Sequence, residues 1–507
     1  MSIRYLLCWA LHSERTVCLP GGGDPETMAP RRQPLSWSKG GCRNRSGRMR
    51  QSPGSCGMGS PAELALRHPA FAPLRQAAGE LGVRAWAVGG YVRDLLLGRP
   101  QPDLDVVVED GRAMDLAVRF AQLTGARPPV LFPRFGTAQV TWHDRLIEFA
   151  SARAESYAAD SRKPEVRPVS IEQDLRRRDF TVNAMLLDFE GRLLDPLGGR
   201  VDLERRLLRT PAEPERAFSD DPLRMLRAAR LAAQLGFDLD PALLPAMRRL
   251  RERARPPVLS VERIHEELVK LLLSERPRRG LEILDEGGLL ELLLPELSAC
   301  HGVEQGNWHT HDVFGHTLLA VDKAPPDLTV RLAALLHDIG KPPTATPDGA
   351  FHGHDVVGAA MAEEVMARLR FSRSETDSVS RLVRLHLRPV FYEPENWGAA
   401  AVRRLARDAG ELLEPLLQLA RADIAASAYP DAWKLDDLER RLQAVLQNEA
   451  KVLRPPVEGG DIMRIRGIGP GPEVGRLKAA LTELVLDGAL PPEREAISAY
   501  LAAHPEL

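Results

Sequence analysis

The sequence predicts an α+β fold, in which a small mixed sheet near the N-terminus is followed by a mainly α-helical remainder. Two apolar runs of strand length, Val83–Val88 and Leu146–Arg153, alternate in the manner of buried or half-buried strands. Beyond residue 200 the recognisable segments are helical, among them a helix opened by Pro222 and another over Leu438–Pro456. The chain has 507 residues, and a prior of roughly 150 residues per domain suggests about three domains.

The composition is that of a globular protein, with 44% hydrophobic and 27% charged residues. The net charge of −2 gives no whole-chain signature of nucleic-acid binding, although arginines gather locally, as in Arg248–Arg255. No apolar run reaches about 18 residues, so we expect no transmembrane helix and no membrane partner.

Residues 1–60 are expected to be a disordered leader or the result of a misassigned start, with Met58 as the alternative start. Their Gly, Pro, Ser and Arg show no periodicity and cannot bury enough apolar surface to become ordered. Beyond them the only cysteine is Cys300, which favours a reducing cytoplasm. The other four cysteines have spacings that fit no zinc pattern: Cys8, Cys18, Cys42 and Cys56.

The first candidate site begins where the strand Val83–Val88 ends in Gly89 and Gly90. A short helix, "YVRDLLLG", follows and is stopped by Gly98. A strand, a glycine pair and a helix allow backbone N–H groups to approach a phosphate closely. Taken alone, a glycine pair is usually only a turn.

Two aspartates make the turn more informative. In "PDLDVVVE", Asp103 and Asp105 alternate on an expected strand, so both carboxylates project from one face. Two such charges repel unless a cation lies between them, and Mg²⁺ favours carboxylates together with substrate phosphates. A metal held in this way activates an attacking hydroxyl and steadies a leaving pyrophosphate.

These residues, "GGYVRDLLLG" and "PDLDVVVE", resemble the signature of the DNA polymerase β superfamily, in the form found in bacterial CCA-adding tRNA nucleotidyltransferases and bacterial poly(A) polymerases. The resemblance covers roughly residues 65–300. Its later motifs follow in the family order: "LIEFASAR" with Glu148 as a third acid, "SIEQDLRRRDFTVNAM", "FSDDPLRMLRAARLAAQLGF" and the segment Leu259–Leu297.

The basic motif supplies the candidates for binding the triphosphate. Arg177 and Arg178 can grip phosphate oxygens with paired N–H groups, and Arg93 joins Gly89 and Gly90 in cradling the phosphates. Asp179 and Asn183 are four residues apart, and we expect them to share a helix face and to orient the arginines or a ribose hydroxyl. Seen alone, "RRRD" would be a solvated charge run.

The resemblance assigns base selection to Asp221 and Arg224, with Arg227 as a further nucleotide-binding candidate. A carboxylate and a guanidinium three residues apart on a helix offer an acceptor and a donor fork to a base edge. In this family the pair selects CTP and ATP without a nucleic-acid template. Asp220 stands where many members have Glu, which keeps the charge but shortens the reach.

A second constellation lies between residues 301 and 450. Histidines and aspartates occur at helix ends and beside apolar runs, as in "LAALLHDIGKP", and suit a first-row transition metal. They resemble the HD family of metal-dependent phosphohydrolases. That resemblance implies a core ligand set and an extra pair used by two-metal members: His316, His337, Asp338 and Asp423, then His354 and His386. We expect Ni²⁺ or Mn²⁺ there, and Lys341 and Arg331 are near enough in sequence to bind a phosphate.

The motifs divide the chain as follows: a leader (1–60), a nucleotidyltransferase head (61–200), a helical neck and body (201–300), an HD domain (301–450) and a helical tail (451–507). The expected activity is template-independent addition of CCA to the tRNA 3′ end from CTP and ATP with Mg²⁺. Basic helices beyond residue 240 are expected to grip the tRNA, and the HD domain to act on RNA ends.

Several alternatives stay open. One alternative is the addition of only CC or only A, and the loop between Arg153 and Arg177, which governs the switch between bases in this family, does not decide between these activities. A poly(A) polymerase would share the head, but we expect it to lack the HD domain. An HD phosphohydrolase with a non-catalytic tRNA-binding head, or an RNA-binding scaffold, is disfavoured because both metal aspartates are present.

Overall fold

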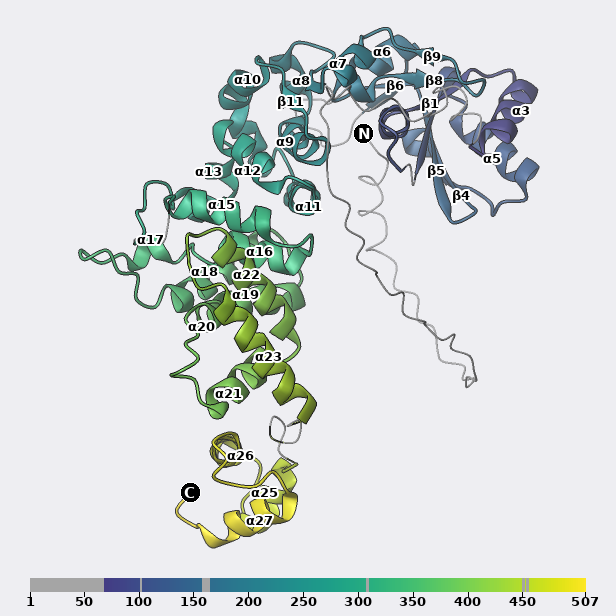
Figure 1. Cartoon of the computed structure of the whole chain (residues 1–507). Helices are drawn as coiled ribbons and strands as arrows, with labels where there is room; N and C mark the ends of the chain where they lie inside the picture. The colour runs from purple at the N-terminus through teal and green to yellow at the C-terminus, as the bar shows by residue number, and fades with distance from the viewer. Residues whose placement is uncertain (1–67, 101–102, 157–164, 307–309, 449–451, 453–455) are drawn as a thin grey trace, which may run out of the picture. The chain divides into compact units, whose positions relative to one another are not determined.

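The computed structural model describes residues 68–100, 103–156, 165–306, 310–448, 452 and 456–507 (Figure 1). The leader expected over residues 1–60 lies outside these residues. The chain divides into two compact units. The head unit comprises the described residues up to Arg178 together with Asn183–Leu197, and the helical unit comprises Asp179–Val182 and Gly198–Leu507.

The head unit is built on a seven-stranded sheet in the order β3-β4-β5-β2-β1-β8-β9. Strands β2 and β5 are parallel, whereas the other neighbours are antiparallel, so the sheet is mixed, as predicted. The strands are β1 (Ala85–Val88), β2 (Leu104–Val108), β3 (Val130–Phe132), β4 (Thr137–Trp142), β5 (Arg145–Ser151), β8 (Leu186–Leu187) and β9 (Leu193–Leu194). A separate hairpin joins β6 (Arg153–Ser156) to β7 (Glu165–Pro168).

The two faces of this sheet differ. Helix α5 (Ala113–Thr124) packs on β4 and β5, where Phe120 contacts Phe149, and α3 (Phe71–Leu81) packs on α5. On the other face a second apolar cluster includes Trp86 and Val107. Since successive strand residues alternate between faces, Asp105 lies on the face of Val107, away from α5. Helix α4 (Gly90–Leu96) begins directly after the C-terminal end of β1.

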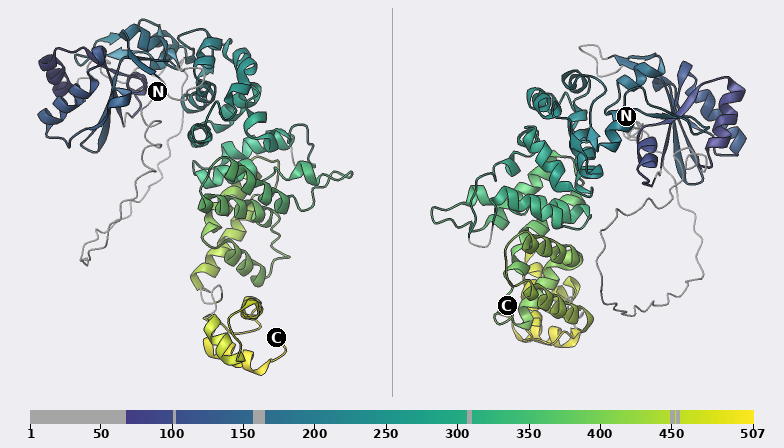
Figure 2. Two further views of the ribbon diagram at one scale, coloured as in Figure 1. Left: turned by 180° about the vertical axis from the view of Figure 1, so that it is seen from behind. Right: turned by 45° about the horizontal axis from the view of Figure 1, so that its top comes forward.

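The helical unit is almost entirely α-helical, as the views from two further sides show (Figure 2). Its first part contains α7 (Gly199–Glu204), α8 (Pro214–Asp220), α9 (Leu223–Leu235), α10 (Leu243–Leu250), α11 (Val261–Leu272), α12 (Pro277–Glu286), α13 (Leu290–Leu293) and α14 (Pro295–Ser298). Helix α9 packs against both α11 and α12. A Cβ on Gly280 would lie 2.8 Å from Cγ of Leu271, so glycine at this position of α12 allows the close approach of α12 to α11.

The second part holds the histidine-rich region and the tail. Its helices are α15 (Val313–Lys323), α16 (Leu328–Leu336), α17 (Lys341–Thr344), α18 (His354–Arg368), α19 (Arg373–Leu385), α20 (Leu387–Val390), α21 (Ala399–Ala409), α22 (Leu413–Ala425) and α23 (Trp433–Asn448). Helix α23 begins five residues before the predicted Leu438. Among the described residues, no helix is long and apolar enough to span a membrane.

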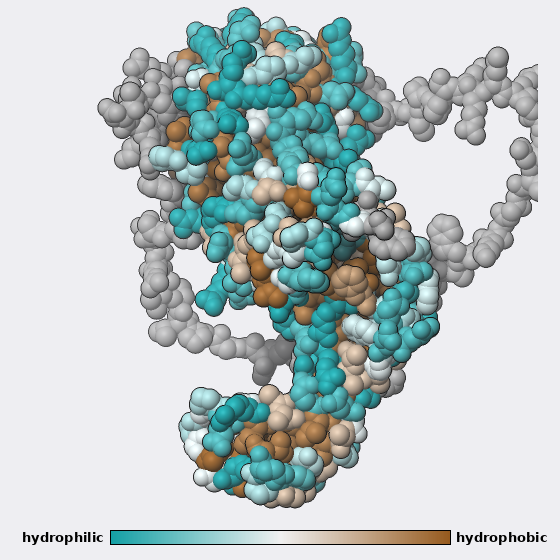
Figure 3. Space-filling view, turned by 90° about the vertical axis from the view of Figure 1, so that its left-hand side faces the viewer, coloured by the Kyte–Doolittle hydropathy of each residue, from teal (hydrophilic) through white to brown (hydrophobic). Residues whose placement is uncertain are grey.

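The tail is helical, as predicted, and consists of α25 (Gly459–Arg466), α26 (Pro472–Leu486) and α27 (Arg494–Ala503). These helices enclose their own apolar cluster, which includes Ile462, Leu481 and Ile497. In Figure 3 the tail, at the foot of the view, shows apolar surface among hydrophilic residues. Arg404 of α21 binds Glu483 of α26 at 2.8 Å and ties the tail to the preceding helices.

Candidate active sites

The glycine turn lies between β1 and α4. Gly89 has φ +76°, a conformation that favours glycine. A Cβ on Gly89 would lie 3.1 Å from Oδ2 of Asp105 and 3.7 Å from Nη1 of Arg178. The turn therefore brings bare backbone against a carboxylate and a guanidinium, while Gly90 begins the helix.

Three acidic side chains belong to this site. Asp105 lies opposite Glu148 of β5 in the parallel register, and Asp103 comes one residue before β2 rather than within it. Glu148 is buried and accepts a hydrogen bond from Gln139 at 2.8 Å. Burial, together with the neighbouring carboxylate of Glu148, raises the pKa of Asp105 to about 6. Crowded carboxylate oxygens are a donor set that suits a hard cation such as Mg²⁺.

The two arginines of the basic motif are bound to a carboxylate that the sequence did not single out. Asp174, on α6 (Ile171–Arg176), is buried and accepts from Nε and Nη2 of both Arg177 and Arg178, at 2.7–3.2 Å. Burial raises the pKa of Asp174, but the two arginines lower it further, to about 2. Asp174 therefore orients both guanidinium groups, and the guanidinium of Arg178 lies near Gly89.

Arg93, predicted to cradle a phosphate, is a buried part of the same unit. Its Nε and Nη2 bind both carboxylate oxygens of Asp94, at 2.9 and 2.8 Å. Its Nη1 donates to Oδ1 of Asn183 at 2.7 Å. Asn183 thus orients an arginine, as expected, but the arginine is Arg93.

The prediction that Asp179 and Asn183 share a helix face is wrong. Only Thr181–Asn183 form a 3₁₀ turn, and the carboxylate of Asp179 accepts from the backbone N–H of Phe180. Asp179 belongs to the helical unit and Asn183 to the head unit. In the helical unit Asp179 binds Nε and Nη2 of Arg227, at 2.9 and 2.5 Å.

The prediction that Asp221 and Arg224 share one helix is wrong, because Asp221 has an extended backbone in the joint between α8 and α9, while Arg224 lies in α9. Oδ1 of Asp221 accepts from the backbone N–H of Leu223 at 3.2 Å, which forms an Asx turn just before α9. Nη1 of Arg224 donates to the carbonyl of Ala217 at 3.0 Å. The carboxylate of Asp221 is bound by Arg263 of α11, a residue that sequence reasoning missed.

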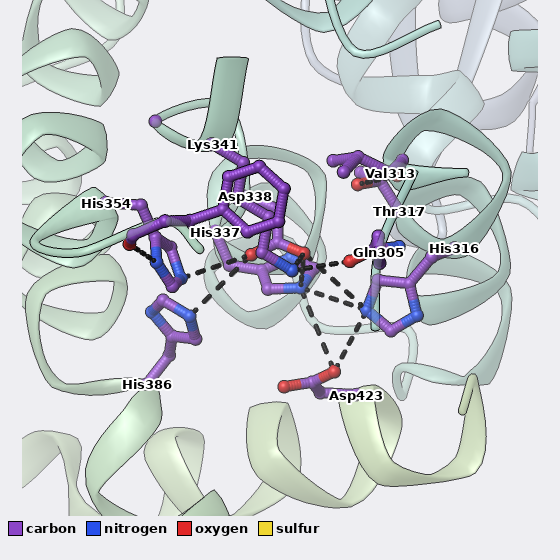
Figure 4. Close-up of polar contacts among 12 residues, drawn as sticks. Gln305, Val313, His316, Thr317, His337, Asp338, Lys341, His354, His386 and Asp423 are labelled. Carbon is purple, nitrogen blue, oxygen red and sulfur yellow. Dashed lines mark hydrogen bonds and ion pairs between the residues drawn. The ribbon is translucent and has the colours of Figure 1, made fainter. Parts of the chain in front are cut away.

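The histidine-rich region forms one buried cluster (Figure 4). Asp338 lies at its centre. Its Oδ2 is 3.2 Å from Nε2 of His337 and 3.8 Å from Nε2 of His316, and its Oδ1 is 3.5 Å from Nε2 of His354 and 3.9 Å from Nε2 of His386. Asp423 completes the set, with Oδ1 3.0 Å from Nε2 of His316. All six predicted ligands therefore meet, whereas His352 is exposed.

The imidazoles are oriented by the backbone. In all four histidines Nδ1 faces a carbonyl oxygen, at 2.6–3.4 Å, and Nε2 faces the centre of the cluster. Ligating histidines are commonly fixed in this way. Nε2 of His354 and of His386 is buried and has no hydrogen-bond partner within the part of the chain that the structure describes. Burial lowers the pKa of His386 to about 4, which keeps it in the neutral form that binds metals. These orphaned nitrogen atoms fit a metal ion bound beside Asp338.

Lys341 and Arg331, the two cations expected to bind a phosphate here, have different hydrogen-bond partners. Nζ of Lys341 donates to Asp338 at 2.7 Å and to Gln305 at 2.6 Å. Burial opposes ionisation of Asp338, but His337 and Lys341 hold its pKa well below the ordinary value. The expectation for Arg331 is wrong, because its buried guanidinium donates to the backbone carbonyls of Leu272, Ser274 and Ala324.

Three family models match consecutive segments of the chain. They describe a poly(A) polymerase head domain over residues 85–209, a probable RNA- and SrmB-binding site of polymerase A over residues 236–300, and an HD domain over residues 309–427.

Curated relatives cover most of the chain. An A-adding tRNA nucleotidyltransferase of Deinococcus radiodurans is 36% identical over 78% of this chain and 90% of its own. A CC-adding tRNA nucleotidyltransferase of Thermus thermophilus is 37% identical over 81% and 92%. A multifunctional CCA protein of Neisseria gonorrhoeae is 39% identical over 60% and 74%.

Solved structures are similar as well. The CCA-adding enzyme of Bacillus stearothermophilus in complex with CTP has a TM-score of 0.64 and 26% identity, covering 89% of this chain and 98% of its own. The CCA-adding enzyme of Thermotoga maritima complexed with tRNA shares the fold, with a TM-score of 0.52 and 21% identity over 87% and 98%.

Proposed function

The chain belongs to the family of tRNA nucleotidyltransferases, and from this premise we propose that its head adds CMP, CMP and AMP to the 3′ end of tRNA. The substrates are CTP, ATP and a tRNA that lacks its terminal CCA. The observation that carries the proposal is the meeting of Asp105, Glu148 and Arg178 at the Gly89 turn. We place the boundaries between the domains near residues 200, 300 and 450.

We also propose that the enzyme is cytoplasmic, because Cys300 is the only cysteine in the sequence beyond residue 60.

In the head, Asp103 and Asp105 would hold Mg²⁺, with Glu148 beside them. Bound there, Mg²⁺ supplies charge neutralisation for the attacking hydroxyl and the leaving pyrophosphate. Gly89 and Gly90 offer backbone N–H groups to the phosphates. Arg177 and Arg178 are pre-oriented by Asp174, so they bind the triphosphate with little loss of side-chain freedom.

Arg93 supports this site from within the fold. Its donors bind Asp94 and Asn183, and it therefore fixes α4 and the segment after α6 rather than receiving a phosphate itself. In the helical unit Asp221 and Arg224 select the base, while Arg227 ties α9 to Asp179.

A second candidate, addition of CC alone or of A alone, is favoured by one specific observation. The match covers 92% of the CC-adding relative and 90% of the A-adding relative. The test offers purified protein three tRNAs, ending before CCA, after CC, and with full CCA, each with labelled CTP or ATP. Full CCA addition requires CTP incorporation on the first tRNA and ATP incorporation on the second.

The metal assignment has its own test. Asp103→Ala and Asp105→Ala should abolish incorporation, whereas Asp115→Ala, an exposed aspartate on α5, should not. Retained incorporation in the Asp103 variant would make the head assignment wrong. Extension of an unrelated RNA by a long A tail, with no tRNA extended, would favour a poly(A) polymerase.

For the HD domain we propose phosphohydrolase activity on RNA ends with a transition metal such as Ni²⁺ or Mn²⁺. Six candidate ligands, Asp338 among them, support it, and Lys341 at that carboxylate would receive a phosphate oxygen. The assay is hydrolysis of the 2′,3′-cyclic phosphate at an RNA end, which opens the ring to a 2′- or 3′-phosphomonoester, after addition of either metal. Activity that persists in His337→Ala would refute the ligand assignment.

A further inference from the structure

Gln305 lies on a short segment that is attached to the start of α15. The backbone N–H of Val313 donates to the carbonyl oxygen of Val303 at 3.0 Å. The backbone N–H of Gly302 donates to the carboxylate of Asp312 at 2.8 Å. Helix α15 also carries one of the predicted metal ligands, so this attachment brings Gln305 to the edge of the ligand cluster (Figure 4).

Gln305 shares Lys341 with another predicted ligand. Oε1 of Gln305 accepts from Nζ of Lys341 at 2.6 Å, and Oδ2 of Asp338 accepts from the same nitrogen at 2.7 Å. The ammonium group also lies over the ring of Phe351, 5.8 Å from the ring centroid. An ammonium group has three N–H donors, and within the described residues these two oxygens are its acceptors. One donor of Lys341 therefore remains for a further acceptor.

The amide nitrogen of Gln305 is a second source of donors. Nε2 of Gln305 is buried and has no hydrogen-bond acceptor in the part of the chain that the structure describes. A buried donor without an acceptor is unfavourable, so this group calls for a partner. Gln305 and Lys341 together thus bring donors without acceptors to the side of Asp338. Such donors suit the oxygen atoms of a phosphate ester.

A neutral amide at residue 305 suits an anionic ligand better than a carboxylate would. Glutamate would also accept from Lys341, and the ion pair would be stronger. However, it would add a negative charge to a site that already contains Asp338 and Asp423, and it has no N–H donor. Gln305 fixes the ammonium group of Lys341 and leaves its positive charge available to a phosphate.

Resting on the phosphohydrolase activity proposed for the HD domain, we propose that Gln305 is a substrate-binding residue of that site. Its oxygen holds Lys341 in place, and its Nε2 donates to an oxygen of the terminal phosphate ester of an RNA. Hydrolysis of a cyclic ester adds one water and breaks one P–O bond, which takes the phosphate from one negative charge to nearly two. Gln305 and Lys341 therefore bind the opened product as well as the cyclic substrate.

The first test measures hydrolysis of an RNA with a 2′,3′-cyclic end by the full chain loaded with Ni²⁺ or Mn²⁺. We expect Gln305→Ala to raise KM by about tenfold, the order of one hydrogen bond to a charged group. Gln305→Glu keeps an acceptor for Lys341 but replaces the N–H donors by a negative charge, and should raise KM at least as much. Gln418→Ala removes an exposed glutamine of α22 that donates to Glu414, and should leave KM unchanged.

The second test needs no turnover. Calorimetric titration of the metal-loaded chain with inorganic phosphate should give a Kd about tenfold higher for Gln305→Ala than for the unchanged chain. Affinity for the metal should be equal in the two proteins, because Gln305 is not a ligand. His337→Ala, which lacks a ligand, reports any phosphate that binds outside the HD site. Normal phosphate affinity in Gln305→Ala, or loss of metal affinity together with phosphate affinity, would overturn the proposal.

The two tests separate the residue from the reaction. If the unchanged chain leaves the cyclic end intact but binds phosphate in a way that depends on His337 and Gln305, the proposed reaction fails and the role of Gln305 stands. If the chain hydrolyses the RNA and both Gln305 variants keep the KM and the phosphate Kd of the unchanged chain, only the role of Gln305 is refuted. Should Gln305→Ala fail to fold, Gln305→Glu decides, and an unchanged phosphate Kd in that variant refutes the proposal.

Discussion

Gly340 lies so close to the backbone of His354 that no β-carbon fits between them. A Cβ on Gly340 would overlap the His354 carbonyl oxygen and approach the amide nitrogen of Gly358 to 2.6 Å. Both contacts involve backbone atoms of α18, which cannot rotate away as a flexible side chain can. The close approach of Gly340 to α18 therefore fixes where His354 meets Asp338.

The first prediction concerns Gly340→Ala. The added methyl group should displace the start of α18 and lower the affinity of the histidine cluster for Ni²⁺ or Mn²⁺ by about 10–100-fold, as changes around metal ligands do. Calorimetric titration of the metal-free protein measures this. Gly398→Ala, at a glycine whose Cβ would meet open space, is the matched control and should bind normally. Nucleotide addition should stay unchanged in both variants, and a loss in the Gly340 variant would contradict a local effect.

The second prediction concerns Gly89→Ala. The new side chain would be strained at φ +76° and would press on the Asp105 carboxylate, so nucleotide addition should fall by at least about tenfold. Gly125→Ala is the control, because Gly125 has φ +66° and no atom of the described residues lies within 4 Å of its Cβ position. Both variants should lose about 1 kcal/mol or more of stability from backbone strain. Equal loss of activity in the two variants would show that strain, not contact with Asp105, is responsible.

The third prediction is the pH dependence of the Asp174 ion pairs. Since the pKa of Asp174 is lowered to about 2, its contribution to stability is full above about pH 4 and is lost as pH falls toward 2. A shift of nearly two pKa units corresponds to about 2 kcal/mol. Asp174→Asn should therefore lower the free energy of unfolding of the head by about this amount at pH 7, and by progressively less below pH 4.

Urea titrations at several pH values would measure this difference. Asp115→Asn, which removes an exposed pair with Arg112, is the control and should change stability by less than about 1 kcal/mol at any pH. A difference for Asp174→Asn that is the same at pH 7 and pH 2 would contradict the assigned ionisation.

The fourth prediction concerns Cys300. Burial raises the pKa of its thiol to about 12, so the reactive thiolate is scarce at neutral pH. Alkylation measured on the peptide containing Cys300 should be slow in the native protein and fast in urea. Rapid labelling of the native protein would show that this part of the chain opens readily.

The sequence predicts the local framework of the first site well. The alternation before Gly89 places β1, the two glycines place the turn, and Gly98 places the end of α4, because each signal acts on its own neighbours. The six ligands, Asp338 among them, are also predicted, although their meeting depends on five different segments of the chain. For this cluster the prediction was possible because histidine and aspartate are themselves metal-ligating residue types.

The partners of the charged residues are not predictable in the same way. Arg263 reaches Asp221 from 42 residues away, and Arg331 donates to carbonyl oxygens more than 50 residues before it. No local pattern specifies such contacts, because they arise only when helices pack. The same reason explains why the predicted helix for Asp179 and Asn183 is wrong, because both side chains accept hydrogen bonds from distant segments instead.

The parallel register of β2 and β5 limits how this chain can be altered. Asp105 stands opposite Glu148 only because the two strands pair residue for residue. Deleting one residue of β2 would turn Asp105 to the other face of the sheet, toward α5. The turn at His143 and Asp144, between β4 and β5, is exposed and contains neither of these two carboxylates. Tags, linkers and inserted domains therefore belong in exposed turns of this kind and never within the paired strands.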